Sequence, residues 1–317
     1  MSNAEDFTGF LEQLDRDGFF VWRELLDHDL IDEHLTGFAE LNATLGVEPN
    51  VDFHSYSNEK QAAIKEARYR FHLERESTQR LVFNSRLTAF LTRLFGEEPV
   101  MRQPETGFYT RRTPDHTDSL DFKVEPKGAE VRMWCALEDI HHDSGPVYFV
   151  PGSHKAISQV IEEEVLSEHP EFAQSLVSQL GATTSIEFFR VTKPMWRYVK
   201  EEKLPRSIQE KGLRREVHPL KKGDVVVFSS DVVHGTSRRN NGGLTRKYMV
   251  AYWAAKSAGW YHSRAYWGPL HDFRAPENVI TARVETTSFG HRMHFQELHA
   301  AYMASFEKPI VIRSSTS

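Results

Sequence analysis

The feature that most constrains the fold is a series of short, β-branched and aromatic runs in the part of the chain after Pro99. The runs lie at residues 106–110, 131–137, 147–150, 224–228 and 246–253. Turn-forming sequences separate them, such as Ser144-Gly145-Pro146 and Lys222-Gly223-Asp224. Strands of this length, divided by turns of this kind, are typical of an antiparallel barrel or jelly roll. We therefore predict an all-β core that is either a barrel or a jelly roll.

Helical patterns flank and interrupt the β-rich part. We expect helices over residues 5–17, 29–45, 58–79, 84–95, 157–180 and 288–306. The chain contains no repeat, low-complexity tract or linker that would divide it, so we predict a single domain over residues 1–317. Within it we assign the following segments: a helical N-terminal support at 1–98, the jelly-roll core at 99–155 and 216–254, an insertion or lid at 156–215, and a C-terminal extension at 255–317.

The composition limits the partners of the protein. The net charge of −6 argues against nucleic acid as the main partner, because phosphate binding needs a concentrated basic surface. The single cysteine, Cys135, indicates a reducing compartment. The acidic N-terminus does not read as a secretory signal, and no apolar stretch approaches the ~18 residues of a membrane span. We expect a cytoplasmic monomer or homodimer that acts on a small molecule and binds neither nucleic acid nor a membrane.

The segment Asp115-His116-Thr117-Asp118 carries candidate metal ligands. On an extended chain, residues i and i+2 point to the same face, so His116 and Asp118 would project to one side. One imidazole and one carboxylate are two of the three ligands in the arrangement that holds iron(II) with open positions. His234, which follows another apolar run, is the candidate third ligand. By itself the His-x-Asp pattern is weak, because a turn with a solvated aspartate would look the same.

Three ordered blocks of sequence resemble the phytanoyl-CoA dioxygenase family of iron(II)/2-oxoglutarate oxygenases. The blocks are Asp17-Gly18-Phe19-Phe20-Val21, then Trp134-Cys135-Ala136-Leu137-Glu138-Asp139 leading to Val150-Pro151-Gly152-Ser153-His154-Lys155, and finally Gly223-Asp224-Val225-Val226-Val227-Phe228 leading to His234-Gly235-Thr236 and Arg246. The resemblance is weaker over residues 156–215 and 255–317. It implies a mainly β fold with flanking helices, in which a double-stranded β-helix (a cupin-like jelly roll) carries N-terminal and inserted helices.

The resemblance also implies roles for individual residues. His116, Asp118 and His234 would bind iron(II). Arg246 would hold the distal carboxylate of 2-oxoglutarate, which suits a planar, permanently charged guanidinium. Thr236 would place a hydroxyl beside that carboxylate, and Trp134 would wall the same pocket. The cosubstrates would be 2-oxoglutarate and dioxygen.

The function implied is a dioxygenase that hydroxylates an aliphatic C–H bond of a small polar or anionic metabolite and releases succinate and carbon dioxide. An amino acid or a specialised-metabolite intermediate would suit this role. Asp118 argues against halogenation, because related halogenases lack this carboxylate. Desaturation or cyclisation at the same site, and a non-catalytic jelly-roll binding protein, are the alternatives. A cupin-like enzyme with another metal lacks support because Arg246 is retained, and a zinc hydrolase because the helical His-Glu-x-x-His pattern is absent.

Other polar motifs have simpler interpretations. Ser153 and His154 fit a structural turn, and His141-His142-Asp143 fits a solvated loop better than a second metal site. Cys135 alternates with Trp134 and fits a small buried hydrophobe. We expect some basic residues to face an anionic substrate, the candidates being Arg111, Arg112, Arg190 and Arg197.

Overall fold

The computed structural model describes residues 6–48, 51, 53–108, 112–120, 123–178, 185–261, 279–293, 297, 300, 301 and 304. The helices described are α1 (Thr8–Asp17), α2 (His28–Thr44), α3 (Asn58–Glu74), α4 (Glu76–Val82), α5 (Ser85–Phe95), α6 (Ser153–Ala156), α7 (Ile161–Glu168), α8 (Pro170–Ser178), α9 (Ser185–Tyr198) and α10 (Leu204–Glu210), with 3-10 turns η1 (Phe53–Ser55) and η2 (Asp118–Leu120) and a π-helical turn η3 (Val199–Lys203). The strands are β1 (Phe19–Trp22), β2 (Pro99–Gly107), β3 (Lys123–Glu125), β4 (Glu130–Ala136), β5 (Val147–Phe149), β6 (Glu216–Val217), β7 (Val225–Ser229), β8 (His234–Thr236), β9 (Tyr248–Ala255), β10 (Gly259–Tyr261), β11 (Val284–Thr286) and β12 (His291–Met293).

The largest sheet has the strand order β1-β7-β4-β9-β2-β12-β11 and is antiparallel except between β12 and β2. Strand β4 lies between β7 and β9, so that Trp134 is opposite Val226 on one side and Val250 on the other. Because side chains alternate across a strand, Met133 and Cys135 face one side of the sheet and Arg132 and Trp134 face the other.

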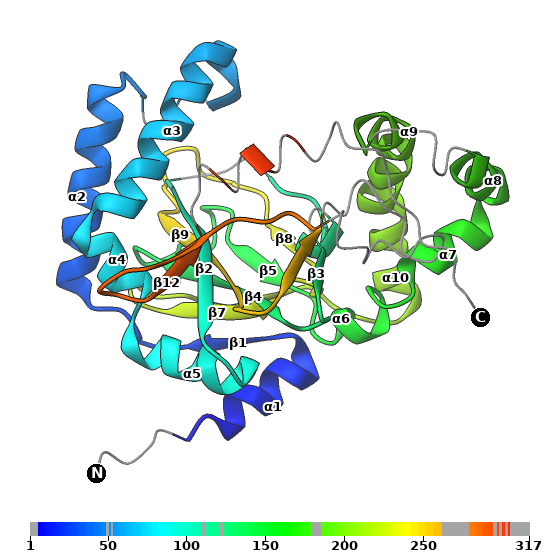
Figure 1. Cartoon of the computed structure of the whole chain (residues 1–317), viewed down its shortest axis with the longest axis horizontal. Coiled ribbons are helices and arrows are strands. Elements are labelled where there is room, and N and C mark those ends of the chain that lie inside the picture. Colours follow the sequence, from blue (N-terminus) through cyan, green and yellow to red (C-terminus); the bar gives the residue numbers. More distant parts are fainter. Residues whose placement is uncertain are drawn as a thin grey trace.

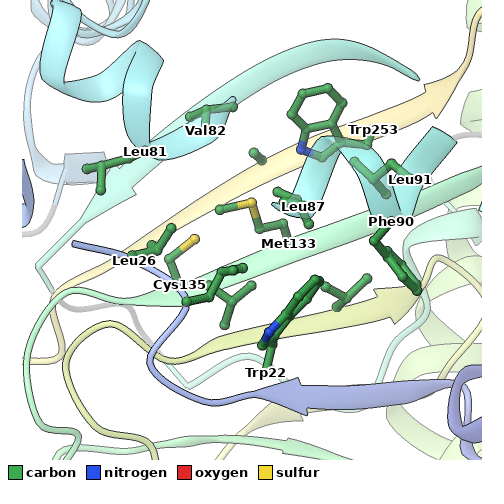
Figure 2. Close-up of a cluster of buried hydrophobic side chains, with 14 of the residues drawn as sticks. Trp22, Leu26, Leu81, Val82, Leu87, Phe90, Leu91, Met133, Cys135 and Trp253 are labelled. Carbon is green, nitrogen blue, oxygen red and sulfur yellow. The ribbon is translucent and has the colours of Figure 1, made fainter. Parts of the chain in front are cut away.

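One face of this sheet is covered by helices of the N-terminal part, with α1 and α5 below it and α2 to α4 beside it in Figure 1. Figure 2 shows the apolar core beneath α4 and α5, where Trp22, Phe90, Met133, Cys135 and Trp253 lie together. Full burial of one such side chain contributes roughly 1.5–3 kcal/mol, so this core is a large part of the stability. Cys135 is a buried hydrophobe, as its alternation with Trp134 predicted.

The opposite face of the large sheet packs against a smaller sheet with the order β6-β5-β8. Phe149 of β5 contacts Phe19 and Phe228 of the large sheet, with ring centroids 4.7 Å and 5.1 Å apart. Trp134 and Val226 belong to the same cluster. Two antiparallel sheets packed in this way, with helices outside, form the mainly β jelly roll that the sequence predicted.

Helices α6 to α10 lie between β5 and β6 in the sequence and gather at one end of the sheets (Figure 1). Their apolar side chains pack on Leu120 and Val233, which belong to the segments around His116 and His234. Lys203 is buried in this group, with its Nζ 2.7 Å from both Glu164 and Glu168. Within the part of the chain described, no helix is both long and apolar enough to cross a bilayer.

Three helix predictions need correction. The helix expected over 157–180 starts only at Ile161 and is divided at His169, between α7 and α8. The helix expected over 58–79 is broken at Arg75, whose extended backbone separates α3 from α4. The helix expected over 288–306 is wrong at its start, because residues 291–293 form β12 and pair with β2. The turn at Gly290 joins β11 to β12, and its φ of 157° favours glycine. Pairing with the free edge of β2 outweighs the local helical pattern.

Candidate active site

A short backbone bridge joins His116 and His234, which are far apart in the sequence. The His116 N–H donates to the His234 carbonyl oxygen at 3.0 Å, and the His234 N–H donates to the His116 carbonyl oxygen at 2.9 Å. His234 also begins β8 and is paired with Phe149 of β5. Because opposed residues of an antiparallel pair point to the same side, the two imidazoles lie together, with ring centroids 4.2 Å apart.

Backbone carbonyls fix the orientation of both imidazoles. Nδ1 of His116 lies 3.0 Å from the carbonyl oxygen of Pro114, and Nδ1 of His234 lies 3.0 Å from that of Val232. A carbonyl oxygen can only accept, so each Nδ1 carries the proton of the neutral ring. The lone pair of each Nε2 is left for a metal, which is the usual arrangement for histidine ligands in proteins.

Asp118 opens the turn η2 directly after this bridge. Its Oδ1 lies 3.7 Å from Nε2 of His116, and its Oδ2 lies 3.8 Å from Nε2 of His234. Burial by itself would raise the pKa of Asp118, but His234, Arg132 and His116 outweigh it and hold the pKa at about 2. The carboxylate is therefore ionised at neutral pH.

The donor set fits iron(II). Burial and the neighbouring His116 lower the pKa of His234 to about 4, so its ring is neutral and can ligate near pH 7. The three ligand atoms of His116, Asp118 and His234 lie within 4.8 Å of one another. Two imidazole nitrogens and one carboxylate oxygen on one side of an ion leave positions open for other ligands. The three side chains expose 15%, 21% and 10% of their surface, so small molecules can reach the site.

Arg246 lies two residues before β9, in line with Tyr248 on the inner face of the large sheet. Its backbone N–H donates to the Phe108 carbonyl at 2.7 Å, and its guanidinium donates to the Gly145 carbonyl. The guanidinium lies 5.6 Å from the centre of the Tyr248 ring. The side chain is buried, and burial lowers the pKa of Arg246. A buried guanidinium is stabilised by a carboxylate, so this position suits an anionic ligand.

Thr236 and Trp134 lie on β8 and β4, in the two sheets that face each other. The Thr236 hydroxyl oxygen accepts from the Thr113 N–H at 2.8 Å, and among the described residues the hydroxyl itself donates to no acceptor. Trp134 is buried and stacks on Tyr248, with ring centroids 5.5 Å apart and planes 7° from parallel. Trp134, Tyr248 and Arg246 thus occupy one wall of the interior.

Two contacts hold the ligand-bearing segments in place. Asp115 accepts from the Tyr148 hydroxyl at 2.6 Å and forms an ion pair with Arg215, which anchors the residue before His116. The buried Ser153 hydroxyl accepts from the Val233 N–H at 2.8 Å, which anchors the residue before His234. The structural role predicted for Ser153 is therefore confirmed.

Four charged residues of the large sheet were not predicted from the sequence as part of the site. Arg132 and Glu130 lie on β4, beside Trp134 on its inner face, and both are buried. Arg102 is also buried, with its guanidinium 4.6 Å from the centre of the Tyr252 ring. Glu105 is paired with Val250 in the register of β2 and β9, which places it on the same inner face. For Arg132 the available signal was a charge within the strand predicted over 131–137, where charged residues are rare unless paired.

The group His141-His142-Asp143 also brings three possible ligand atoms within 4.8 Å. It lies in an exposed loop, and Nδ1 of His141 accepts from the Asp143 N–H at 3.1 Å. His142 exposes 80% of its side chain. These contacts agree with the solvated loop expected from the sequence.

Three of the four arginines expected to face a substrate lie at the surface of the protein. Arg112, Arg190 and Arg197 are exposed, and Arg197 is paired with Glu201 at 2.9 Å. Arg111 lies outside the described residues. The buried arginines of the interior are the better candidates for an anionic group.

The sequence matches the phytanoyl-CoA dioxygenase (PhyH) family over residues 14–248, a range that contains all six site residues named from the sequence. The phytanoyl-CoA dioxygenase domain-containing protein 1 homolog of Caenorhabditis elegans is 19% identical over 291 residues, which cover 78% of this chain and 91% of the worm protein.

Solved structures of similar fold include two enzymes of nogalamycin biosynthesis. The non-heme α-ketoglutarate-dependent carbocyclase SnoK has a TM-score of 0.52 at 14% identity, covering 80% of this chain and 85% of its own. The epimerase SnoN has a TM-score of 0.50 at 18% identity, covering 85% and 90%. At this level of identity the two structures show a shared fold.

Proposed function

The chain belongs to the phytanoyl-CoA dioxygenase family of iron(II)- and 2-oxoglutarate-dependent oxygenases, and from this premise we propose that it hydroxylates an aliphatic C–H bond of a small polar or anionic metabolite. The reaction would release succinate and carbon dioxide. The observation that carries the proposal is the convergence of His116, Asp118 and His234 on one point, with both Nε2 atoms directed there by backbone contacts.

His116, Asp118 and His234 would hold the iron. When bound with 2-oxoglutarate, iron(II) supplies the activation of dioxygen that the oxidation of a C–H bond requires. The protein contributes the fixed positions of the three ligands and the enclosure of the site between two sheets. The ionised Asp118 balances part of the metal charge, and the neutral His234 needs to lose no proton before binding.

Arg246 would bind the distal carboxylate of 2-oxoglutarate. Its burial supports this role, because a buried guanidinium gains most from a carboxylate partner. The Thr236 hydroxyl, on the strand that begins with His234, would donate to the same carboxylate. Trp134 and Tyr248, stacked together, would form the apolar wall against which the methylene groups of the cosubstrate lie.

Charges of both signs in the interior support a zwitterionic substrate, of which an amino acid is the simplest kind. Glu105 is exposed to solvent, and its Oε1 accepts from Gln103 at 2.5 Å. A substrate ammonium group would pair with this carboxylate. Arg102 would bind an anionic group of the same molecule. Its guanidinium lies over the rings of Tyr252 and Trp260.

Anaerobic titration tests the metal site. Iron(II) and 2-oxoglutarate added to the protein should give the visible charge-transfer band of the chelate, and His234→Ala should abolish it. His142→Ala, which removes an exposed histidine, is the matched control and should leave the band unchanged. A wild-type protein without the band, or a His234→Ala variant that retains it, would contradict the proposal.

Succinate release over a panel of amino acids and other small acids would then test the reaction. Mass spectrometry of the product separates hydroxylation, which adds one oxygen atom, from desaturation or cyclisation, which remove two hydrogen atoms. A non-catalytic binding protein would bind 2-oxoglutarate, but it would not release succinate with any member of the panel.

A further inference from the structure

Arg132 is a buried guanidinium held on three sides. Its Nε donates to Oδ2 of Asp118 at 3.1 Å, and its Nη1 forms an ion pair with Glu130. The guanidinium carbon lies 4.3 Å from the centre of the Tyr252 ring. Arg132 and Glu130 each expose 1% of their side chain. The guanidinium therefore has a single orientation, and that orientation directs one N–H at a candidate iron ligand.

The contact distinguishes the two oxygens of Asp118. Oδ2 accepts from Arg132, whereas Oδ1 accepts no hydrogen bond from any described residue. A carboxylate that used both oxygens on the metal would occupy two positions, and one of the positions needed by a chelating cosubstrate would be lost. A hydrogen bond to Oδ2 makes that oxygen a poorer ligand and resists rotation of the carboxylate.

Glu130 lowers the electrostatic cost of this arrangement. An isolated guanidinium this close to Asp118 would repel a divalent cation, since two like charges interact strongly in a poorly solvated interior. The Glu130 carboxylate offsets part of the positive charge of Arg132, so Asp118 keeps more of its own charge toward the metal. Glu130, Arg132 and Asp118 thus form a chain of alternating charge that ends at the candidate iron site.

Stability alone does not account for this buried pair. Taking two charges out of water costs several kcal/mol each, and apolar residues of similar volume often stabilise a core as well or better. Resting on the function proposed above, we propose that Arg132 is a positioning residue that keeps Asp118 a ligand through one oxygen, and so preserves the position that 2-oxoglutarate needs.

The test uses two variants that remove the contact between Arg132 and Asp118 or change its geometry. Glu130→Leu/Arg132→Leu replaces both members by apolar residues, and Arg132→Lys keeps the charge but loses the planar fork. Lys203→Met is the matched control, because it removes another buried cation that lies between two carboxylates, in the helical insertion. Thermal unfolding of the metal-free proteins establishes that each variant is folded.

Two affinities are then measured without turnover. Competition with a chelator gives the iron(II) affinity, and the charge-transfer band gives the 2-oxoglutarate affinity of the iron(II) form. We expect the double variant to bind iron(II) as tightly as the wild type or more tightly, while its affinity for 2-oxoglutarate falls. The 2-oxoglutarate affinity of Arg132→Lys should lie between those of the wild type and the double variant. Lys203→Met should match the wild type in both affinities.

The outcomes separate this inference from the function on which it rests. A wild-type protein without the band contradicts the proposed function itself. A wild-type band, with 2-oxoglutarate affinity unchanged in the folded variants, contradicts only the role of Arg132. A parallel loss of both affinities also contradicts it, because that result indicates general disruption of the site. If the double variant does not fold, Arg132→Lys decides by the same two measurements.

Discussion

Acid should destabilise this protein through two buried histidines, His34 of α2 and His72 of α3. Both are almost fully buried and both contact the hydroxyl of Thr106 on β2, at 3.0 Å from Nε2 of His34 and 2.8 Å from Nε2 of His72. Nδ1 of His34 also lies 2.8 Å from the hydroxyl of Thr78. These bonds can all be made by neutral rings, and protonation would place a charge in an interior that contains the cationic Arg68 and Arg75 nearby.

The magnitude follows from the pKa values. Burial lowers the pKa of His34 to about 4 and that of His72 to about 3, against about 6.5 in an unfolded chain. As the pH falls, the unfolded chain therefore takes up protons before the folded protein does. Stability is unaffected well above pH 6.5 and is lost progressively from there down to the folded pKa values. At pH ~5 each histidine costs about 2 kcal/mol, or roughly 4 kcal/mol together.

Urea unfolding at pH ~7.5 and ~5 measures this loss. His34→Gln/His72→Gln removes both titrating groups and keeps hydrogen-bonding side chains, so its stability should depend on pH less than that of the wild type by roughly 4 kcal/mol. The exposed His142→Ala variant should behave as the wild type. An equal pH dependence in the wild type and the double variant would refute the assignment, and His34→Gln alone should recover about half of the effect.

Three further outcomes are expected at the site. Ser153→Ala leaves the Val233 N–H without its acceptor, and it should lower the free energy of unfolding in urea by about 1–3 kcal/mol and weaken iron(II) binding in the chelator competition. Arg246→Lys should raise the dissociation constant for 2-oxoglutarate about tenfold or more, as followed by the charge-transfer band, while the exposed Arg112→Lys should not. Asp115→Asn weakens the ion pair with Arg215 and should lower the melting temperature without abolishing the band. Retained iron affinity in Ser153→Ala, or an unchanged 2-oxoglutarate affinity in Arg246→Lys, would count against the assigned contacts.

The sequence was sufficient for the class of fold and for the family. Side chains alternate between the two faces of a strand such as 131–137. Trp134 and Cys135 therefore belong to two different apolar clusters, one on each face of the large sheet. The candidate ligands His116, Asp118 and His234 could be named from the His-x-Asp spacing, from an apolar run before His234 and from the family resemblance. Their spatial contact, however, depends on the closure of two sheets that no local pattern encodes.

Other features depend on tertiary packing and were missed for that reason. Arg132 and Glu130 are individually ordinary strand residues, and only the packing of β4 beside η2 brings the guanidinium to Asp118. Strand β12 replaces the start of a predicted helix because the edge of β2 offers backbone partners that a local helical pattern does not take into account. The break between α3 and α4 at Arg75 could not be predicted either, because no proline or glycine lies there.

His116 and His234 are joined by two backbone hydrogen bonds. The relative position of the two candidate metal ligands therefore depends on the register in which their segments pair. A register shift of one residue turns a side chain to the opposite face of a sheet, so deleting one residue between Thr113 and His116 would direct the imidazole away from its partner. Insertions within the helices α7 to α10 leave that register unchanged. These helices can therefore be lengthened or replaced while the geometry of the proposed iron site is inherited with the sheets.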